Sequence, residues 1–307
     1  MPGHMMLTAQ PDSGADMEFS AMSGDRTGKR RGSFSVFRPG RTLNNPPVTL
    51  DLATGREIFS QPLALMAANP ARVWESLGPV TLSASHLIGN GLLPESSFDP
   101  AAGIFDILRT RLLLGLAERG WRRIAVTSPT HGCGKSFVAS NLALSLSRRS
   151  GSRTVLIDLD LRRPALADLW GVKDISPIED FLSGEQPLES QFRRFGRTLA
   201  LGFSSAPCAM AAERLHDPDT HLALDSMLEH LDPEVVIYDL PPALVSDDVL
   251  ALTPCIDAVL LVTDGTRTSP EDIKATERLF DGRLPLLGVV LNRAQDRNAG
   301  RLHYDRG

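Results

Sequence analysis

The sequence predicts an α/β fold with a mostly parallel, doubly wound sheet flanked by helices, preceded by a largely disordered N-terminal extension. From about residue 101 onward, short apolar runs of the kind that form buried strands alternate with helical stretches. The first of these runs leads through a glycine-bearing loop into a helix, which is the usual order in an open α/β sheet. The 307 residues, 42% of them apolar, are enough to fill a sizeable core.

The N-terminal third differs in composition from the rest of the chain. Residues 1–97 are rich in Gly, Pro, Ser and Asn and show weak periodicity, so we expect a poorly ordered leader. Within it, residues 26–41 interleave arginine and lysine with phenylalanine and valine. This pattern is typical of segments that dock on an anionic membrane face or a partner protein, although a solvated basic tail has the same composition. We place a folded domain at residues 98–296 and a flexible tail at 297–307.

The folded domain begins with a helix and continues as alternating strands and helices. Ile104, Leu108 and Leu112 recur at helical spacing before Gly120 ends the run. The strand-like runs lie at 123–128, 154–159, 235–240, 258–264 and 286–292, with a weaker one at 199–203. Continuous apolar strands separated by helices predict a parallel sheet covered on both faces, because a half-exposed sheet would alternate polar and apolar residues.

Charge, cysteine content and hydropathy exclude several classes of protein. A net charge of −5 and a pI near 5.8 argue against a dedicated nucleic-acid binder, so we expect no nucleic-acid partner. Three widely spaced cysteines suit a reducing compartment better than a disulfide framework. No apolar run approaches the roughly 20 residues of a membrane-spanning helix, and the start has no signal-peptide core. We therefore expect a cytoplasmic protein.

The segment IAVTSPTHGCGKSFVASNLALSL predicts a phosphate-binding loop between a strand and a helix. Gly132 and Gly134 allow backbone N–H groups to surround phosphate oxygens, and the helix that starts near Lys135 directs its positive end at them. Lys135 adds a full charge and Ser136 offers a hydroxyl to Mg²⁺. The usual first glycine is replaced by Pro129. We assign to nucleotide binding Thr130, His131, Gly132, Cys133, Gly134, Lys135, Ser136 and Phe137.

Acidic residues end two of the predicted strands. Asp158 and Asp160 lie two apart, hence on one face, and their repulsion is tolerable if Mg²⁺, water or a cation neutralises it. One of them would take a proton while the other orients the metal shell. The alternative is that one caps a helix and the other is solvated. Asp239, followed by a Pro-Pro turn, is typical of an aspartate that holds the water shell of Mg²⁺ near Ser136.

The order SPTHGCGKS, VLIDLDLRRP and VVIYDLPP resembles the bacterial tyrosine kinases of capsular and exopolysaccharide biosynthesis, a branch of the MinD/ParA-like P-loop ATPases. The resemblance covers about residues 100–295. It implies ATP and Mg²⁺ as cofactors, with Lys135, Asp158 and Asp160 as catalytic residues and Asp158 activating the acceptor hydroxyl. It also implies that Ser136, Asp160 and Asp239 support the metal.

Asn292, at the end of the last strand, falls where relatives of this fold contact the adenine base. A buried asparagine that caps a strand end is the alternative.

The sequence departs from the family pattern in ways that bear on activity. Leu240 replaces the Ser or Thr common after the second acidic motif. Gly103 and Asp106 occupy two positions of the E-x-x-R-x-x-R assembly motif. The chain has two tyrosines, and only Tyr304 lies near its end, whereas the family carries a C-terminal tyrosine cluster.

Three functions are compatible with these features. The first is an ATP- and Mg²⁺-dependent tyrosine-kinase-like protein that regulates exopolysaccharide biosynthesis or export. Its expected partner is a membrane polysaccharide co-polymerase or export protein at the inner face of the cell membrane, and self-association stays open. The second is a regulatory P-loop ATPase without kinase activity, favoured by the missing tyrosine cluster. A membrane-cycling ATPase is the third, disfavoured because Thr130 stands where such proteins carry a lysine.

Overall fold

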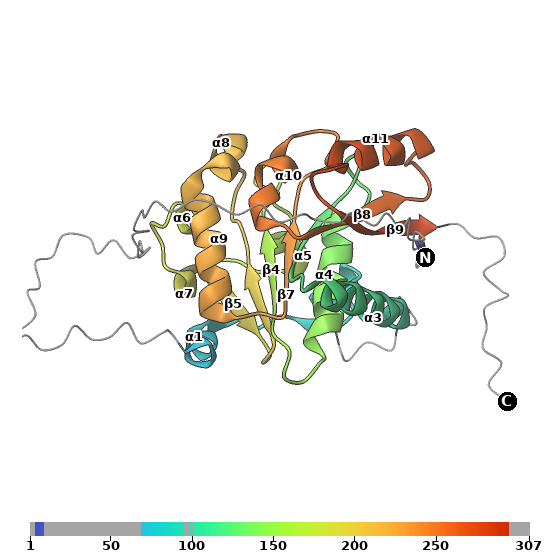
Figure 1. Ribbon diagram of the computed structural model, residues 1–307. Coiled ribbons are helices and arrows are strands. Elements are labelled where there is room, and N and C mark those ends of the chain that lie inside the picture. Colours follow the sequence, from blue (N-terminus) through green and yellow to red (C-terminus); the bar gives the residue numbers. More distant parts are fainter. Residues whose placement is uncertain (1–3, 9–68, 95–98, 100, 295–307) are drawn as a thin grey trace, which may run out of the picture.

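The computed structural model describes residues 4–8, 69–94, 99 and 101–294, which form one sheet with helices around it (Figure 1). In chain order the strands are β1 His4–Thr8, β2 Gly78–Pro79, β3 Arg123–Thr127, β4 Thr154–Asp158, β5 Phe192–Phe195, β6 Leu199–Gly202, β7 Val235–Asp239, β8 Ala258–Asp264 and β9 Leu286–Ala294. The helices are α1 Pro70–Ser76, α2 Ala84–Gly89, α3 Ala101–Arg119, α4 Lys135–Ser147, α5 Leu166–Trp170, α6 Glu179–Leu182, α7 Leu188–Gln191, α8 Ala211–His216, α9 Pro218–Leu231, α10 Asp248–Ala251 and α11 Pro270–Phe280, with a 3-10 turn at Thr253–Cys255.

The sheet has nine strands in the order β1-β9-β8-β3-β7-β4-β6-β5-β2. Neighbouring strands run parallel except β1 with β9 and β5 with β6, which are antiparallel. All six strands predicted from apolar runs are present, so the predicted mostly parallel sheet is confirmed. The strands that sequence patterns did not predict, β1, β2 and β5, lie toward the two edges of the sheet.

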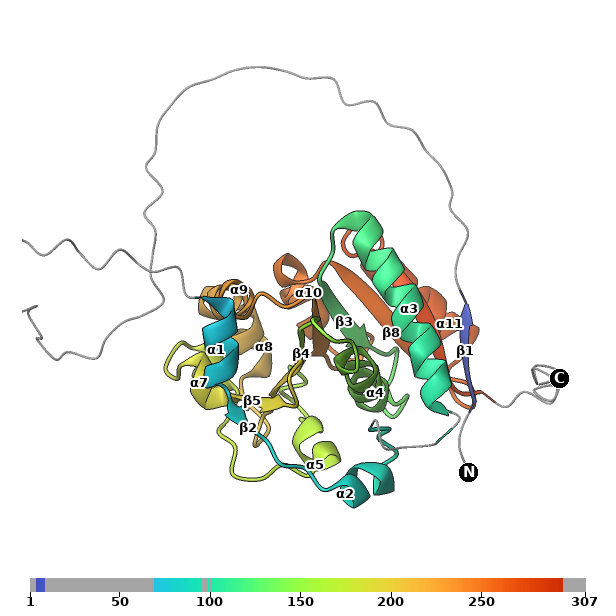
Figure 2. The ribbon, with the colours of Figure 1, turned by 90° about the horizontal axis from the view of Figure 1, so that it is seen from below.

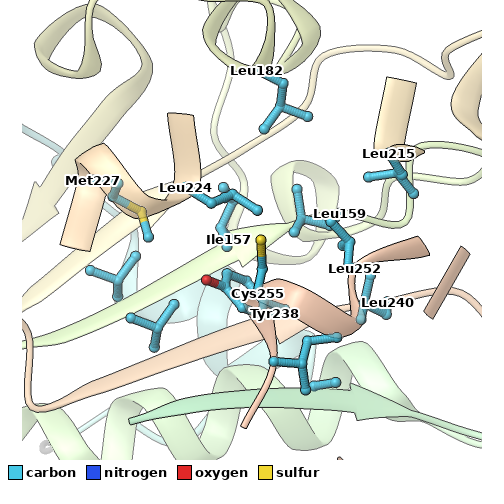
Figure 3. Packing of buried hydrophobic residues seen from close by; sticks show 14 of the residues in the cluster. Ile157, Leu159, Leu182, Leu215, Leu224, Met227, Tyr238, Leu240, Leu252 and Cys255 are labelled. Atoms are coloured by element: carbon cyan, nitrogen blue, oxygen red, sulfur yellow. The ribbon is translucent and has the colours of Figure 1, made fainter. Parts of the chain in front are cut away.

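Successive residues of the central strands are buried alternately in two separate apolar layers, one on each face of the sheet. In β4, Val155 and Ile157 join the layer under α1, α6 and α9, whereas Leu156 joins the layer under α3, α4 and α5. Figure 3 shows the first layer, where Ile157 and Tyr238 face Leu224 of α9. Burial on both faces explains why these strands read as unbroken apolar runs.

The folded part begins earlier than the predicted boundary at residue 98. Trp74 and Leu77, around α1, and Leu92, after α2, are almost fully buried. The Trp74 indole N–H donates to the carbonyl of Arg197 at 2.8 Å. Figure 2 shows α2 beside α5, and α1 and α2 belong to different apolar layers: Trp74 of α1 to the layer under α9, and Leu87 of α2 to the layer under α3, α4 and α5. The predicted extent of the leader, residues 1–97, is therefore wrong for residues 69–94, and for residues 4–8, which form β1 beside β9. These few apolar residues lack a period because they bury against distant elements rather than against each other.

The basic segment at residues 26–41 and the tail at 297–307 lie outside the described residues. Among the helices that the structure describes, none has the length and apolar character needed to cross a membrane.

Candidate nucleotide-binding site

The loop between β3 and α4 has the backbone of an anion-binding turn. Gly132 and Gly134 adopt φ of +81° and +91°, a region that side chains with a Cβ rarely enter. Gly134 is also the N-cap of α4, and no side chain caps that helix end. The first N–H groups of α4 are therefore left for a ligand, and the helix dipole favours an anion there.

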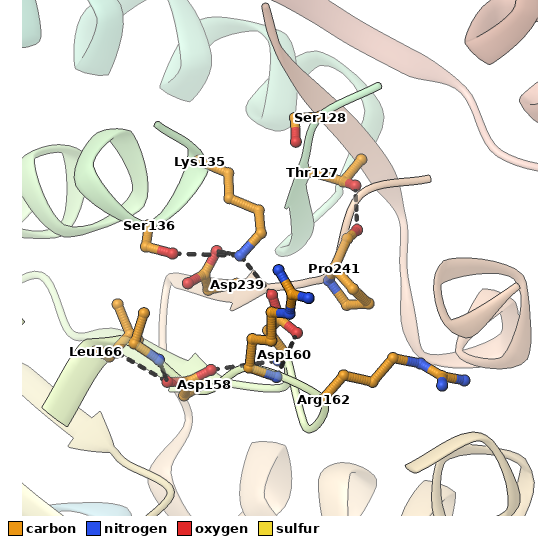
Figure 4. A network of polar contacts seen from close by, with 12 residues as sticks. Thr127, Ser128, Lys135, Ser136, Asp158, Asp160, Arg162, Leu166, Asp239 and Pro241 are labelled. Atoms are coloured by element: carbon orange, nitrogen blue, oxygen red, sulfur yellow. Dashed lines mark hydrogen bonds and ion pairs between the residues drawn. The ribbon is translucent and has the colours of Figure 1, made fainter. Parts of the chain in front are cut away.

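Carboxylates from two neighbouring strands meet Lys135 at the carboxyl edge of the sheet (Figure 4). The Lys135 ammonium lies 2.7 Å from Asp160 Oδ2 and 3.6 Å from Asp239 Oδ1, and it donates to Ser136 Oγ at 3.3 Å. Burial alone would lower the pKa of Lys135, but Asp239 and Asp160 outweigh it and raise the pKa, so the lysine stays charged.

Asp158 is fully buried and anchored to backbone amides. Its Oδ2 accepts from the N–H groups of Ala165 and Leu166, both at 2.9 Å, and its Oδ1 accepts from the N–H of Asp160 at 3.2 Å. Burial and the charge of Asp239 raise the pKa of Asp158 to about 8, against the opposing effect of these amides and of Lys135. Asp158 thus accepts from the first N–H groups of α5, although the N-cap residue of that helix is Ala165 and not an aspartate. Asp160 is buried and paired rather than solvated.

Asp239 is a buried carboxylate without a hydrogen-bond partner among the described residues. Burial raises its pKa despite the positive charge of Lys135. A buried carboxylate that lacks hydrogen bonds is costly unless cations lie against it; Lys135, 3.6 Å away, is one such cation, and a metal ion would be a second. Carboxylate and hydroxyl oxygens are the ligands that Mg²⁺ prefers, so Asp239, Asp160 and Ser136 are a donor set that fits this metal.

The remaining predicted loop residues divide by where their side chains lie. Cys133 is buried, and its thiol donates to the carbonyl of Thr130 at 3.2 Å. Phe137 packs edge-on against Phe105 of α3, with ring centroids 6.1 Å apart. His131 is exposed. The predicted nucleotide contacts of these four residues stay predictions. For Cys133 and Phe137, whose side chains pack within the protein, we expect the contact through the backbone N–H groups.

Asn292 lies against the phosphate loop. Its amide donates to the carbonyl of Cys133 at 2.9 Å, and its oxygen accepts from the N–H of Arg293 at 3.0 Å. The predicted adenine contact stays a prediction. Sequence reasoning did not identify Arg293, whose guanidinium donates to the carbonyl of Gly132 at 2.7 Å. No local pattern marks this residue, because its partner lies 161 positions away in the chain.

Comparisons with known proteins agree with this geometry. Residues 124–306 match the family model of the CobQ/CobB/MinD/ParA nucleotide binding domain. A Ralstonia solanacearum protein named "Putative tyrosine-protein kinase EpsB" is 32% identical over 213 residues, which are 67% of this chain and 27% of that protein. Tyrosine-protein kinase YwqD of Bacillus subtilis (strain 168) is 26% identical over 191 residues, 61% of this chain and 79% of that protein.

A solved structure gives the same picture. The kinase domain of VpsO superposes with a TM-score of 0.56 at 28% identity, covering 64% of this chain and 95% of that domain. The chain spans about a quarter of the length of the first curated relatives it matches. The resemblance to bacterial tyrosine kinases that the motifs predict is thereby confirmed. The chain belongs to the CobQ/CobB/MinD/ParA family of nucleotide-binding domains.

Proposed function

We propose that this chain binds ATP with Mg²⁺ and acts as a tyrosine-kinase-like phosphotransferase in exopolysaccharide biosynthesis or export. The observation that carries the proposal is the buried carboxylate of Asp239, which lacks hydrogen bonds among the described residues and lies 3.6 Å from the Lys135 ammonium, near Ser136 and Asp160. Such a cluster supports a bound cation and a phosphate chain at the end of the loop. The names of the curated relatives support the choice of a kinase over other nucleotide-binding proteins.

Each residue of the site has a distinct part in the proposed reaction. The backbone of the loop and Lys135 hold the phosphates, while Ser136, Asp160 and Asp239 hold the metal. When bound, Mg²⁺ neutralises negative charge that develops on the phosphates. Asp158 accepts the proton of the attacking hydroxyl, a role suited to a carboxyl whose pKa is about 8.

The acceptor is proposed to be Tyr304 or a tyrosine of a partner. Of the two tyrosines in the chain, Tyr238 is fully buried in β7, so its hydroxyl is closed to a phosphate donor. Tyr304 lies outside the described residues. The proposed partner is a membrane polysaccharide co-polymerase or export protein that recruits the chain to the inner face of the membrane.

Self-association through α3 receives little support from the contacts of that helix. Asp106 and Arg109 pair with each other at 3.0 Å, and Asp106 also accepts from Ser145 and Arg148 of the α4 region. These side chains are therefore engaged within the chain rather than presented to a second copy.

A regulatory ATPase without kinase activity is the second candidate. Asp158 anchors the first N–H groups of α5, so a change in its charge or contacts would reach that helix directly. This link, together with the scarcity of tyrosines, favours a nucleotide-dependent switch that a partner reads.

Labelled ATP separates the two candidates. Purified protein with Mg²⁺ is followed for protein-bound label and for released phosphate, in wild type, Lys135→Ala and Tyr304→Phe, with and without a synthetic tyrosine-containing peptide. Label that disappears in both variants establishes an autokinase using Tyr304, and label on the peptide establishes transfer to a partner. Phosphate release without label moves the conclusion to a regulatory ATPase. Wild type that neither binds nor turns over ATP overturns both.

A further inference from the structure

Two consecutive residues of β9, the last strand in the chain, hydrogen-bond to the backbone of the phosphate loop. Asn292 donates its side-chain N–H to the carbonyl of Cys133, and Arg293 donates to the carbonyl of Gly132. The two carbonyls are also consecutive. Residues at the end of β9 thus bind two successive peptide units of the loop that follows β3.

Because peptide units are planar, these two hydrogen bonds also fix the direction of the N–H groups in the same units. In a trans peptide unit the C=O and the following N–H point in opposite directions. The carbonyl of Gly132 shares its unit with the N–H of Cys133, and the carbonyl of Cys133 shares its unit with the N–H of Gly134. Holding both carbonyls toward β9 therefore turns the N–H groups of Cys133 and Gly134 away from β9.

The strand order shows what lies on that opposite side. The loop follows β3, which stands between β8 and β9 on one side and β7 and β4 on the other. The carboxylates of Asp239 and Asp160, with Lys135 between them, lie on the β7 and β4 side. The two N–H groups therefore face the space in which the proposed phosphates and metal would lie.

The two holding side chains are themselves fixed. The Arg293 guanidinium lies 2.6 Å from Oδ2 of Asp264, whose side chain has no exposed surface and whose Oδ1 accepts from Thr266. Asn292 touches Gly134 so closely that a Cβ at residue 134 would collide with its amide nitrogen. Glycine at this position is thus required both by the φ of +91° and by the approach of Asn292.

We propose that Asn292 and Arg293 are positioning residues that orient the Cys133 and Gly134 amides for phosphate binding, so that Asn292 acts on the phosphate chain and not on the base. The inference rests on the proposed function, since it concerns the same nucleotide site. It separates this chain from the adenine contact that the family resemblance implies for Asn292.

The test compares ligands with and without a base. Affinities for ATP, GTP and inorganic tripolyphosphate, each with Mg²⁺, are measured for wild type, Asn292→Ala and Arg293→Ala. We expect each variant to lose about tenfold in affinity, by a similar factor for each of the three ligands. The reason is that the loop N–H groups that bind phosphate have changed, whereas any contact with the base has not. Arg293→Lys, which keeps a donor, should lose less than Arg293→Ala.

Several results would overturn the inference. One such result is that Asn292→Ala loses affinity for ATP, keeps its tripolyphosphate affinity and changes the ratio of ATP to GTP affinity. Asn292 would then contact the base. Unchanged affinities in both variants would show that the carbonyl bonds do not matter. If the wild type binds none of the three ligands, the proposed function itself is overturned. If the wild type and the variants bind equally well, only the present inference is overturned.

Two further variants guard the experiment. Arg283→Ala is the matched control, because its guanidinium donates to the carbonyl of Leu279, outside the loop, and its affinities should equal those of wild type. Arg293→Ala leaves the buried Asp264 without its cation and could impair folding for that reason. The double variant with Asp264→Asn removes that charge, keeps an acceptor for Thr266, and should show the same tenfold loss.

Discussion

Asp158 at the end of β4 and Asp239 at the end of β7 are register partners on adjacent parallel strands, and neither side chain has exposed surface. Burial raises the pKa of each carboxyl, and the charge of Asp239 raises that of Asp158 further. Their environments nevertheless differ. Asp158 is satisfied by backbone amides, whereas Asp239 has no hydrogen-bond partner among the described residues. This difference supports the proposal that Asp158 transfers the proton and Asp239 holds the metal.

Asp158→Asn should retain ATP binding and lower turnover at least about tenfold, because the amide keeps an acceptor for α5 but cannot take a proton. Steady-state phosphate release or phosphotransfer at saturating ATP measures the effect. Asp225→Asn is the matched control, since that aspartate is an exposed residue of α9 paired with Arg123 at 3.5 Å. Equal turnover in Asp158→Asn and wild type would remove Asp158 from the chemistry.

Lys135→Ala should abolish measurable ATP affinity, because the ammonium is the cation placed between Asp160 and Asp239 at the end of the loop. Without it these carboxylates would also repel the phosphates. Titration calorimetry with ATP and Mg²⁺ measures the loss, and circular dichroism checks that the variant is folded. A folded variant that binds ATP as wild type does would show that the site is elsewhere.

The Asp257–Arg123 pair gives a prediction on pH. Asp257 accepts from the backbone N–H groups of Arg122 and Arg123 and from the Arg123 guanidinium at 2.8 Å. Burial opposes its charge, but these partners outweigh burial and hold the pKa of Asp257 below its ordinary value. The stabilisation is therefore present above the unfolded-state pKa of about 3.9 and is lost as pH falls through the lower folded-state pKa.

Asp257→Asn should accordingly lower the free energy of unfolding by about 1–2 kcal/mol at pH 7, and by progressively less below about pH 4. Urea unfolding at several pH values measures the difference. Asp232→Asn is the control, because its pair with Arg122 is exposed and such pairs contribute about 0–1 kcal/mol. A pH-independent difference for Asp257→Asn would contradict the assigned cause.

Truncation separates the packed N-terminal elements from the rest of the leader. Removal of residues 1–97 should strongly destabilise the protein relative to removal of residues 1–68, because only the longer deletion takes away Trp74, Leu77 and Leu92. Burial of each such side chain contributes about 1.5–3 kcal/mol, against a net stability of about 5–15 kcal/mol for a typical domain. Thermal unfolding of the two shortened proteins makes the comparison. Equal midpoints would show that residues 69–97 add nothing to the fold.

The sequence by itself determined the central strands, the phosphate loop and the acids at the strand ends. Each of these features is a local sequence pattern: an apolar run, glycines before Lys135 and Ser136, or an aspartate at the end of a strand. Parallel strands bring their carboxyl ends to one edge, so the fold class alone places Asp158 and Asp160 beside Asp239, near the loop that carries Lys135.

Only the tertiary structure decided which side chains complete the site and where the folded part begins. Asn292 meets the loop from 159 residues away, and Trp74 finds its hydrogen-bond partner 123 residues along the chain. Local patterns report propensity and burial, whereas these contacts exist only because folding brings distant backbone groups within hydrogen-bond range.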